Sequence, residues 1–146
     1  MIEAVTENNL EEVLPLIRQY QEFYKVVDIS DARNRKFFSQ FGEGNPSGCQ
    51  FIFRHEGVAA GFATVYFTYT STITSKVAVL NDLHTIPNLR GKGIGRQLIK
   101  HCRNFAASNG ASRLQWVTAL DNETAKKLYG SMNVGKSTWY FYTYNT

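Results

Sequence analysis

The sequence is poor in the features that mark several classes of protein. Its 146 residues include only two cysteines, Cys49 and Cys102, which lie far apart and form no Cys-x-x-Cys pair, so neither a disulfide framework nor a zinc site is indicated. No run reaches the roughly eighteen apolar residues of a membrane span, and the first residues lack the basic and apolar regions of a signal peptide. We therefore expect a cytoplasmic protein that has no membrane partner.

The chain also lacks a strong excess of one charge. Its formal net charge is +4 and its pI is about 9.1, which suits an anionic ligand. The basic residues are scattered except for a cluster between positions 90 and 103. A nucleic-acid module that stacks bases on the aromatic segment 138–144 is therefore the weaker interpretation, and we predict no nucleic-acid partner. The length suits a single domain over residues 1–146.

What the sequence does contain is a regular series of strand and helix patterns. Thr6 is the expected cap of the first helix, in which Pro15 marks either a kink or a later start. The fifth strand follows a crossover helix and should be parallel to the fourth, and the aromatic last strand should be buried on both faces. The predicted strands are 2–5, 50–54, 58–70, 75–86, 113–119 and 138–144, and the predicted helices end at residues 24, 41, 108 and 132.

A glycine-rich stretch from Pro87 to Arg96 joins the fourth strand to the third helix. Glycines let the backbone adopt positive φ and approach a ligand closely, and the first turn of a helix leaves its N–H groups free to face an anion. Arg90, Lys92 and Arg96 place positive charge around these donors. The stretch therefore predicts a site for a phosphate group.

Two common phosphate-binding motifs do not fit this stretch. A Walker loop needs a lysine followed by serine or threonine at the helix start, but here Gly95 is followed by Arg96 and Gln97. A dinucleotide-binding fingerprint has the spacing Gly-x-Gly-x-x-Gly, whereas the glycines here fall at positions 91, 93 and 95, and no parallel βαβ pattern opens the chain.

The residues Arg90-Gly91-Lys92-Gly93-Ile94-Gly95 do match the pattern Arg/Gln-x-x-Gly-x-Gly/Ala, and in this the chain resembles the GNAT superfamily of N-acetyltransferases, whose pyrophosphate loop has that pattern. The downstream residues Asn122-x-x-Ala125-x-x-Leu128-Tyr129 resemble a second signature of the superfamily. The resemblance covers residues 77–134. Two shorter stretches, 80–83 and 114–118, are similar to the branch that contains histone and polyamine acetyltransferases.

The resemblance implies an α/β (α+β) fold with a mixed, mostly antiparallel sheet of six or seven strands flanked by about four helices. It implies an N-acetyltransferase that moves an acetyl group from acetyl-CoA, its cosubstrate, to a primary amine by direct attack in a ternary complex, with no metal. The acceptor would be a polyamine, a small amine, or a lysine of a peptide or protein. It also implies a homodimer formed through the C-terminal strand. The alternative function is non-catalytic binding of an acyl-CoA.

The resemblance further assigns residues to the coenzyme. The strand around residues 83–85 would be splayed from the strand at 116–118, so that pantetheine bonds to its free backbone groups and a backbone N–H polarises the thioester carbonyl. Asn122 would bind the cofactor arm. The alternative is that it caps its helix, and the two interpretations are compatible because Asp121 could cap the helix instead. The predicted cofactor-binding residues are Leu83, His84, Thr85, Arg90, Gly91, Lys92, Gly93, Ile94, Gly95, Arg96, Asn122 and Ala125.

Tyr129 is the predicted general acid. The helical repeat puts Asn122 and Tyr129 on one face, two turns apart, and a buried phenol needs a hydrogen-bond partner. We hypothesise that this partner is the coenzyme A sulfur, because the departing thiolate needs a proton. The alternative is that Tyr129 is only a core aromatic residue.

The predicted base is less well defined. Many members of the resembling branch carry glutamate at the position of Asn81, and asparagine cannot accept a proton. Asp82 is the remaining carboxylate on this strand and is the predicted base or amine anchor, with His84 on the same face as a second candidate. A structural salt bridge is the alternative for Asp82, and packing is the alternative for His84. Tyr24 and Asn81 are predicted to contact the substrate.

Overall fold

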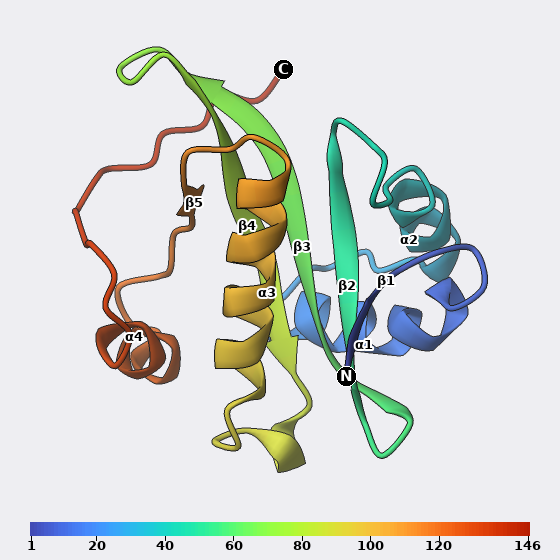
Figure 1. Ribbon diagram of the computed structural model, residues 1–146. Helices are drawn as coiled ribbons and strands as arrows, with labels where there is room; N and C mark the ends of the chain where they lie inside the picture. Colours follow the sequence, from blue (N-terminus) through green and yellow to red (C-terminus); the bar gives the residue numbers. More distant parts are fainter. The chain divides into compact units, whose positions relative to one another are not determined.

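A computed structural model describes residues 1–146 and shows that the chain forms two compact units, Met1–Trp116 and Val117–Thr146. The first unit contains a five-stranded sheet and three α-helices, and the second contains one helix (Figure 1). A single domain over the whole chain stays a prediction. The elements of the first unit are β1 (Ile2–Ala4), α1 (Leu10–Phe23), α2 (Asp31–Phe38), β2 (Gly48–His55), β3 (Val58–Thr70), β4 (Ser75–Thr85), α3 (Ile94–Ser108) and β5 (Leu114–Gln115).

The strands follow the order β1-β2-β3-β4-β5 in the sheet. The first three pairings are antiparallel, and β5 pairs with β4 in parallel, as predicted from the crossover helix. The α/β class with a mixed, mostly antiparallel sheet is therefore confirmed. The strand count is five rather than six or seven, and β5 is only two residues long, pairing with Ala78 and Val79.

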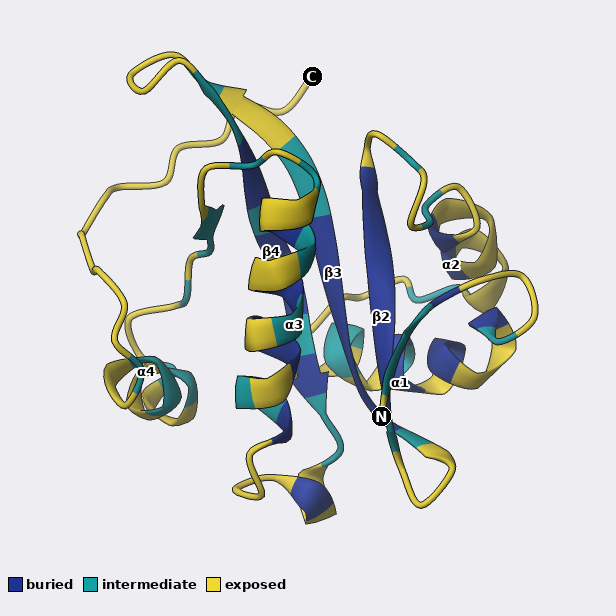
Figure 2. Ribbon diagram, in the orientation of Figure 1, coloured by how far each residue is buried: buried dark blue, intermediate teal, exposed yellow.

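The two faces of the sheet are covered by different helices. Phe62 of β3 belongs to the buried cluster formed with α1, whereas a Cβ on the neighbouring Gly61 would touch Ile94 and Leu98 of α3. Because successive strand residues face opposite sides, α1 and α3 lie on opposite faces. Figure 2 shows that the central strands are buried between them and that the outer side of α3 is exposed.

The first helix begins at Leu10 and continues through Pro15 to Phe23 without a later start. Its cap residue is Asn9 rather than Thr6. The Asn9 side chain is used differently: its Oδ1 accepts from the Thr6 N–H at 2.7 Å, and its Nδ2 donates to the Ala4 carbonyl at 3.1 Å. These bonds stabilise the turn between β1 and α1, and they explain why the helix starts after that turn.

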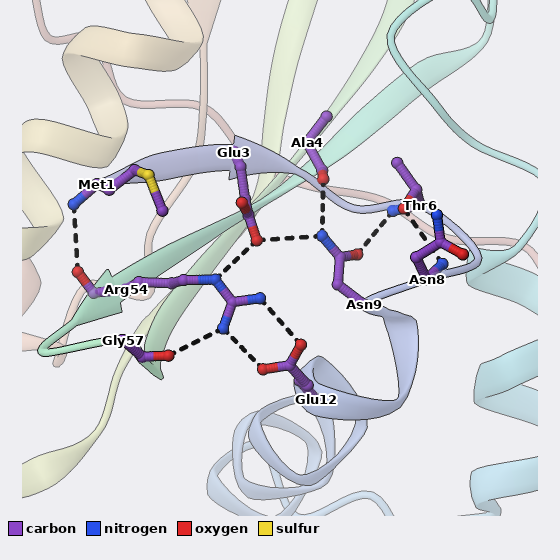
Figure 3. Close-up of polar contacts among 9 residues, drawn as sticks. All are labelled: Met1, Glu3, Ala4, Thr6, Asn8, Asn9, Glu12, Arg54 and Gly57. Carbon is purple, nitrogen blue, oxygen red and sulfur yellow. Dashed lines mark hydrogen bonds and ion pairs between the residues drawn. The ribbon is translucent and has the colours of Figure 1, made fainter.

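Arg54 joins three elements of the first unit. Its guanidinium donates to Glu3 of β1 at 2.7 Å, to both carboxylate oxygens of Glu12 in α1 at 2.7 and 2.9 Å, and to the Gly57 carbonyl at 3.2 Å (Figure 3). A planar guanidinium suits such paired acceptors. The cluster fixes the beginning of α1 against the edge of the sheet and the β2–β3 turn.

The second unit contains α4 (Glu123–Gly130) and a C-terminal segment without regular structure. The prediction of a buried strand over residues 138–144 is wrong, because no strand forms and Trp139, Tyr140, Phe141 and Tyr142 are 85–89% exposed. Aromatic residues favour strands only where a neighbouring strand and an apolar surface can pair with them.

None of the helices is both long and apolar enough to cross a membrane.

The close contact between β3 and β4 gives a test of this packing. A methyl group added at Gly61 would lie 2.7 Å from the His84 carbonyl oxygen and 3.4 Å from the Ile94 side chain. We expect Gly61→Ala to lower the free energy of unfolding by about 1–3 kcal/mol because the backbone must move, measured by urea denaturation. Gly42→Ala is the matched control, since nothing lies within 4 Å of its added methyl. Equal effects of the two changes would contradict this packing.

Candidate active site

The candidate site is organised by an irregularity in β4. Asp82 lies opposite Thr64 of β3, but Leu80 lies opposite Val65, so Asn81 is an extra residue without a partner in β3. Such a bulge changes which residues share a face. Leu80 therefore faces α3 with Val65, whereas Asp82 and His84 face α1 with Thr64 and Phe62.

Asp82 is a buried carboxyl group without a positively charged partner. Its side chain is 8% exposed, and its Oδ1 accepts from Asn81 Nδ2 at 3.1 Å. Burial raises its pKa above the usual range for aspartate, and the neighbouring polar groups of Thr64, Tyr20 and Asn81 offset this only in part. The structure gives it no ion pair, so the salt-bridge alternative does not hold.

Aromatic residues of α1 lie beside this carboxyl group. The Tyr20 hydroxyl donates to the Asn81 carbonyl at 3.3 Å, and the Tyr20 ring contacts Tyr24 at a centroid distance of 4.8 Å. Tyr24, a predicted substrate residue, is about half exposed at the end of α1. Its position next to Tyr20 places it at the solvent end of the group that covers Asp82.

His84 lies on the same face and is also buried, at 6% exposure. Burial, together with the positive charge of Arg90, lowers its pKa to about 4, so the ring is neutral at pH 7. Its Nε2 lies 3.1 Å from Gln19 Oε1. An amide oxygen can only accept a hydrogen bond, so Nε2 carries the hydrogen and Nδ1 has a lone pair.

The predicted phosphate loop follows β4 directly. A 3₁₀ turn (Pro87–Leu89) leads into Gly91 and Gly93, which have φ values of 77° and 82°, and α3 starts immediately afterwards at Ile94. Positive φ at both positions accounts for the two glycines. The N–H groups of Ile94 and Gly95 belong to the first helical turn and have no intrahelical acceptor. This geometry suits an anion.

The basic side chains of the loop lie around this turn. Arg90 donates from Nε to the Thr85 carbonyl at 3.1 Å, which ties the loop to the end of β4. Arg90 and Lys92 are exposed, and Arg96 is half-buried. The first unit thus brings together the loop and the predicted residues Leu83, His84 and Thr85, and β5 does not extend far enough to pair with that part of β4.

The remaining predicted residues lie in α4 of the second unit. Asn122 caps the helix itself, because its Oδ1 accepts from the Ala125 N–H at 3.2 Å, so Asp121 does not take that role. Ala125, Leu128, Tyr129 and Met132 are half-buried while the helix residues between them are exposed. They share one face, as the spacing predicted.

Two residues beside the candidate base, Gln50 and Thr64, were not predicted from the sequence. Thr64 of β3 lies directly opposite Asp82, and Gln50 of β2 lies opposite Thr64, one strand further away. Their signal in the sequence was the presence of polar residues within otherwise apolar strands. No group of three or more His, Cys, Asp or Glu side chains is placed to hold a metal ion.

The fold and the loop define the class of protein. The model of the acetyltransferase (GNAT) family matches residues 13–133. The chain therefore belongs to this family, and it is an acyltransferase.

Particular relatives agree with this assignment. The chain is 32% identical over 117 residues to the uncharacterized N-acetyltransferase YhfO of Bacillus subtilis (strain 168), covering 80% of this chain and 77% of the relative. It is 30% identical over 138 residues to the thialysine N-epsilon-acetyltransferase of Mus musculus, covering 88% and 79%.

Solved structures show the same fold. A probable acetyltransferase superposes with a TM-score of 0.84 at 24% identity, covering 100% of this chain and 97% of the other. The aminoglycoside N-acetyltransferase AAC(6′)-Iy, in complex with a CoA-containing bisubstrate analogue, superposes with a TM-score of 0.83 at 21% identity, covering 100% and 98%.

The state of His84 can be tested directly. We expect its ring to remain neutral, with hydrogen on Nε2, from pH 8 down to about pH 5, because its pKa is lowered to about 4. Two-dimensional NMR of the ring nitrogens measures both properties. Gln19→Leu, which removes the acceptor of the Nε2 hydrogen, should weaken the preference for this tautomer. A titration midpoint above pH 6 in the unaltered protein would contradict the assigned environment.

Proposed function

We propose that the protein transfers an acetyl group from acetyl-CoA to a primary amine by direct attack in a ternary complex. The observation that carries this proposal is the arrangement at the end of β4, where a bulged strand with an edge left open by the short β5 leads straight into a glycine-rich helix start. A diphosphate at the loop would place the rest of the coenzyme along the strand edge. Family membership supports the same cosubstrate.

The coenzyme would be held by the residues predicted for it. The loop from Arg90 to Arg96 would bind the diphosphate through backbone N–H groups and positive charge. Backbone groups at residues 83–85 would bond to pantetheine, and one N–H would stabilise the developing charge on the thioester oxygen. The Asn122 cap uses only the side-chain oxygen, so its amide N–H groups remain available for the cofactor arm, beside Ala125.

Asp82 would act as the base, or as the anchor, for the acceptor amine. At pH 7 the neutral form of a lysine-like amine lies about 4.6 kcal/mol above the ammonium form, so removal of a proton needs help. A buried carboxyl whose pKa is raised is a better base near neutral pH than an ordinary aspartate. Asn81 and Tyr24 would contact the substrate beside it.

The reaction then proceeds with each proton accounted for. Asp82 takes a proton from the ammonium group, and the amine nitrogen attacks the thioester carbon. The carbon–sulfur bond breaks, and Tyr129 gives its proton to the departing thiolate. The nitrogen, positively charged after its attack, loses its second proton to the Tyr129 phenolate as the amide forms, and Asp82 releases the first proton to solvent. The half-buried position of Tyr129 on the same face of α4 as Ala125 supports this role.

The acceptor is a small primary amine in this proposal, with a lysine of a peptide as the other substrate to test. The relatives named for a substrate include thialysine and D-amino-acid acetyltransferases. The corresponding experiment is release of coenzyme A thiol from acetyl-CoA with thialysine, spermidine, a D-amino acid, an aminoglycoside and a lysine peptide. Coenzyme binding by calorimetry without thiol release would support the non-catalytic alternative, and no binding would overturn both.

The same thiol-release assay tests the proposed role of Tyr129 as the general acid. We expect Tyr129→Phe to lower kcat by about 10²- to 10⁴-fold, with little change in coenzyme binding, because only a proton donor is lost. Tyr69→Phe is the matched control, since Tyr69 is 79% exposed near the β3–β4 turn. Unchanged turnover of Tyr129→Phe would remove Tyr129 from the mechanism.

The proposal also includes a homodimer formed through the C-terminal segment, in the cytoplasm. Five aromatic side chains between residues 139 and 144 are at least 85% exposed, and exposed apolar surface of this kind marks interaction sites. Light scattering at micromolar concentration should give twice the chain mass of 16.6 kDa. The double change Trp139→Ser and Phe141→Ser should give the monomer. A monomeric mass for the unaltered protein would contradict the dimer.

A further inference from the structure

Three polar residues form a row across the central strands on the face covered by α1. Gln50 of β2 lies opposite Thr64 of β3, and Thr64 lies opposite Asp82 of β4. Their exposures are 1%, 0% and 8%. The next row on this face is formed by Ile52, Phe62 and His84. A polar row in such surroundings is costly unless its members satisfy one another.

The hydrogen bonds of the row have a definite direction. Gln50 Nε2 donates to Thr64 Oγ1 at 3.1 Å. Thr64 lies directly opposite Asp82 in the sheet, and its hydroxyl group lowers the pKa of the Asp82 carboxyl group. An ionised carboxylate can only accept, and a threonine hydroxyl has a single hydrogen. The Gln50 amide therefore occupies an acceptor site of Thr64, which leaves the hydroxyl hydrogen available to Asp82, the residue opposite it.

Only neutral groups face Asp82. These are Tyr20 from α1, with Tyr24 beyond it, Tyr66 from β3, and His84 on β4 itself. His84 is uncharged at neutral pH because its pKa is about 4, and burial raises the pKa of both Tyr20 and Tyr66 further above neutrality. With no cation present, hydrogen-bond donors alone oppose the loss of hydration of the carboxylate.

We propose that Gln50 and Thr64 are positioning residues that orient the Asp82 carboxylate and favour its ionised form. This inference rests on the proposed role of Asp82 as the base. Gln50 acts through Thr64, and Thr64 acts on Asp82, so neither touches the reacting atoms.

The choice of glutamine at position 50 has a further consequence. Gln50 Oε1 is buried and has no hydrogen-bond partner, which costs stability. When Asp82 has accepted a proton, it can donate to Thr64 Oγ1, and the Thr64 hydrogen then needs a different acceptor. A half rotation of the Gln50 side-chain amide exchanges its nitrogen and oxygen, and the oxygen then supplies that acceptor. The row thus has a hydrogen-bond pattern for each protonation state of the base.

The test compares Thr64→Val with Thr64→Ser. Valine keeps the shape of threonine but cannot donate, so the pKa of Asp82 should rise and the acidic limb of the kcat/KM–pH profile should move up by about 0.5 to 1 pH unit. Serine keeps the hydroxyl and should leave the limb in place. Gln50→Met should also move the acidic limb to higher pH, but by less than Thr64→Val does. Thr68→Val, an exposed change in the same strand, is the control.

A second readout does not depend on activity. The carboxyl ¹³C chemical shift of Asp82 reports its pKa in the protein without substrate, and Thr64→Val should raise that pKa by the same amount as the limb. Should Thr64→Val not fold, Thr64→Ala removes the same donor. An unmoved ¹³C titration in these variants would overturn the inference. An acidic limb that persists in Asp82→Asn would instead show that Asp82 is not the base, so the two failures can be told apart.

Discussion

The single extra residue in β4 is the constraint on which the candidate site depends. Without the bulge at Asn81, strand alternation would keep Asp82 on the same face as Leu80, among the apolar side chains that pack against α3. The bulge turns Asp82 toward α1, where tyrosine and threonine hydroxyl groups can reach it. It also exposes Asn81, whose side chain donates to the same carboxyl group and whose carbonyl accepts from Tyr20.

The position of α1 is the second requirement of this arrangement. Glu12, near the start of the helix, is held by Arg54 of β2. Tyr20, two turns later, covers Asp82 and contacts the rings of Phe62 and His84. The ion pairs at one end and the aromatic packing at the other hold the helix against the sheet. The result is a carboxyl group that is shielded from water and surrounded by neutral groups, so that burial raises its pKa and the neighbouring donors offset only part of that rise.

Local patterns predicted much of the fold. The β2–β3 hairpin, the parallel pairing of β5 and the end of α3 all agree with the structure, because turns, helical spacing and glycine conformations depend on neighbouring residues. The cap of α2 is also a local feature, since the Ser30 side chain accepts from the Arg33 N–H. The C-terminal aromatic segment shows the limit of such reasoning. Its residues favour a strand, but a strand also requires a partner backbone, which residue preferences do not supply.

The candidate site divides in the same way. The sequence by itself determined the glycine-rich loop, its positive charges and the presence of a carboxylate on the preceding strand, since these follow from residues adjacent in the chain. Only the tertiary structure decided that Asp82 is buried without a cation, and that Gln50 and Thr64 lie in line with it. Those properties depend on the register of three strands and on one bulge, and register is set by long-range pairing that no local pattern encodes.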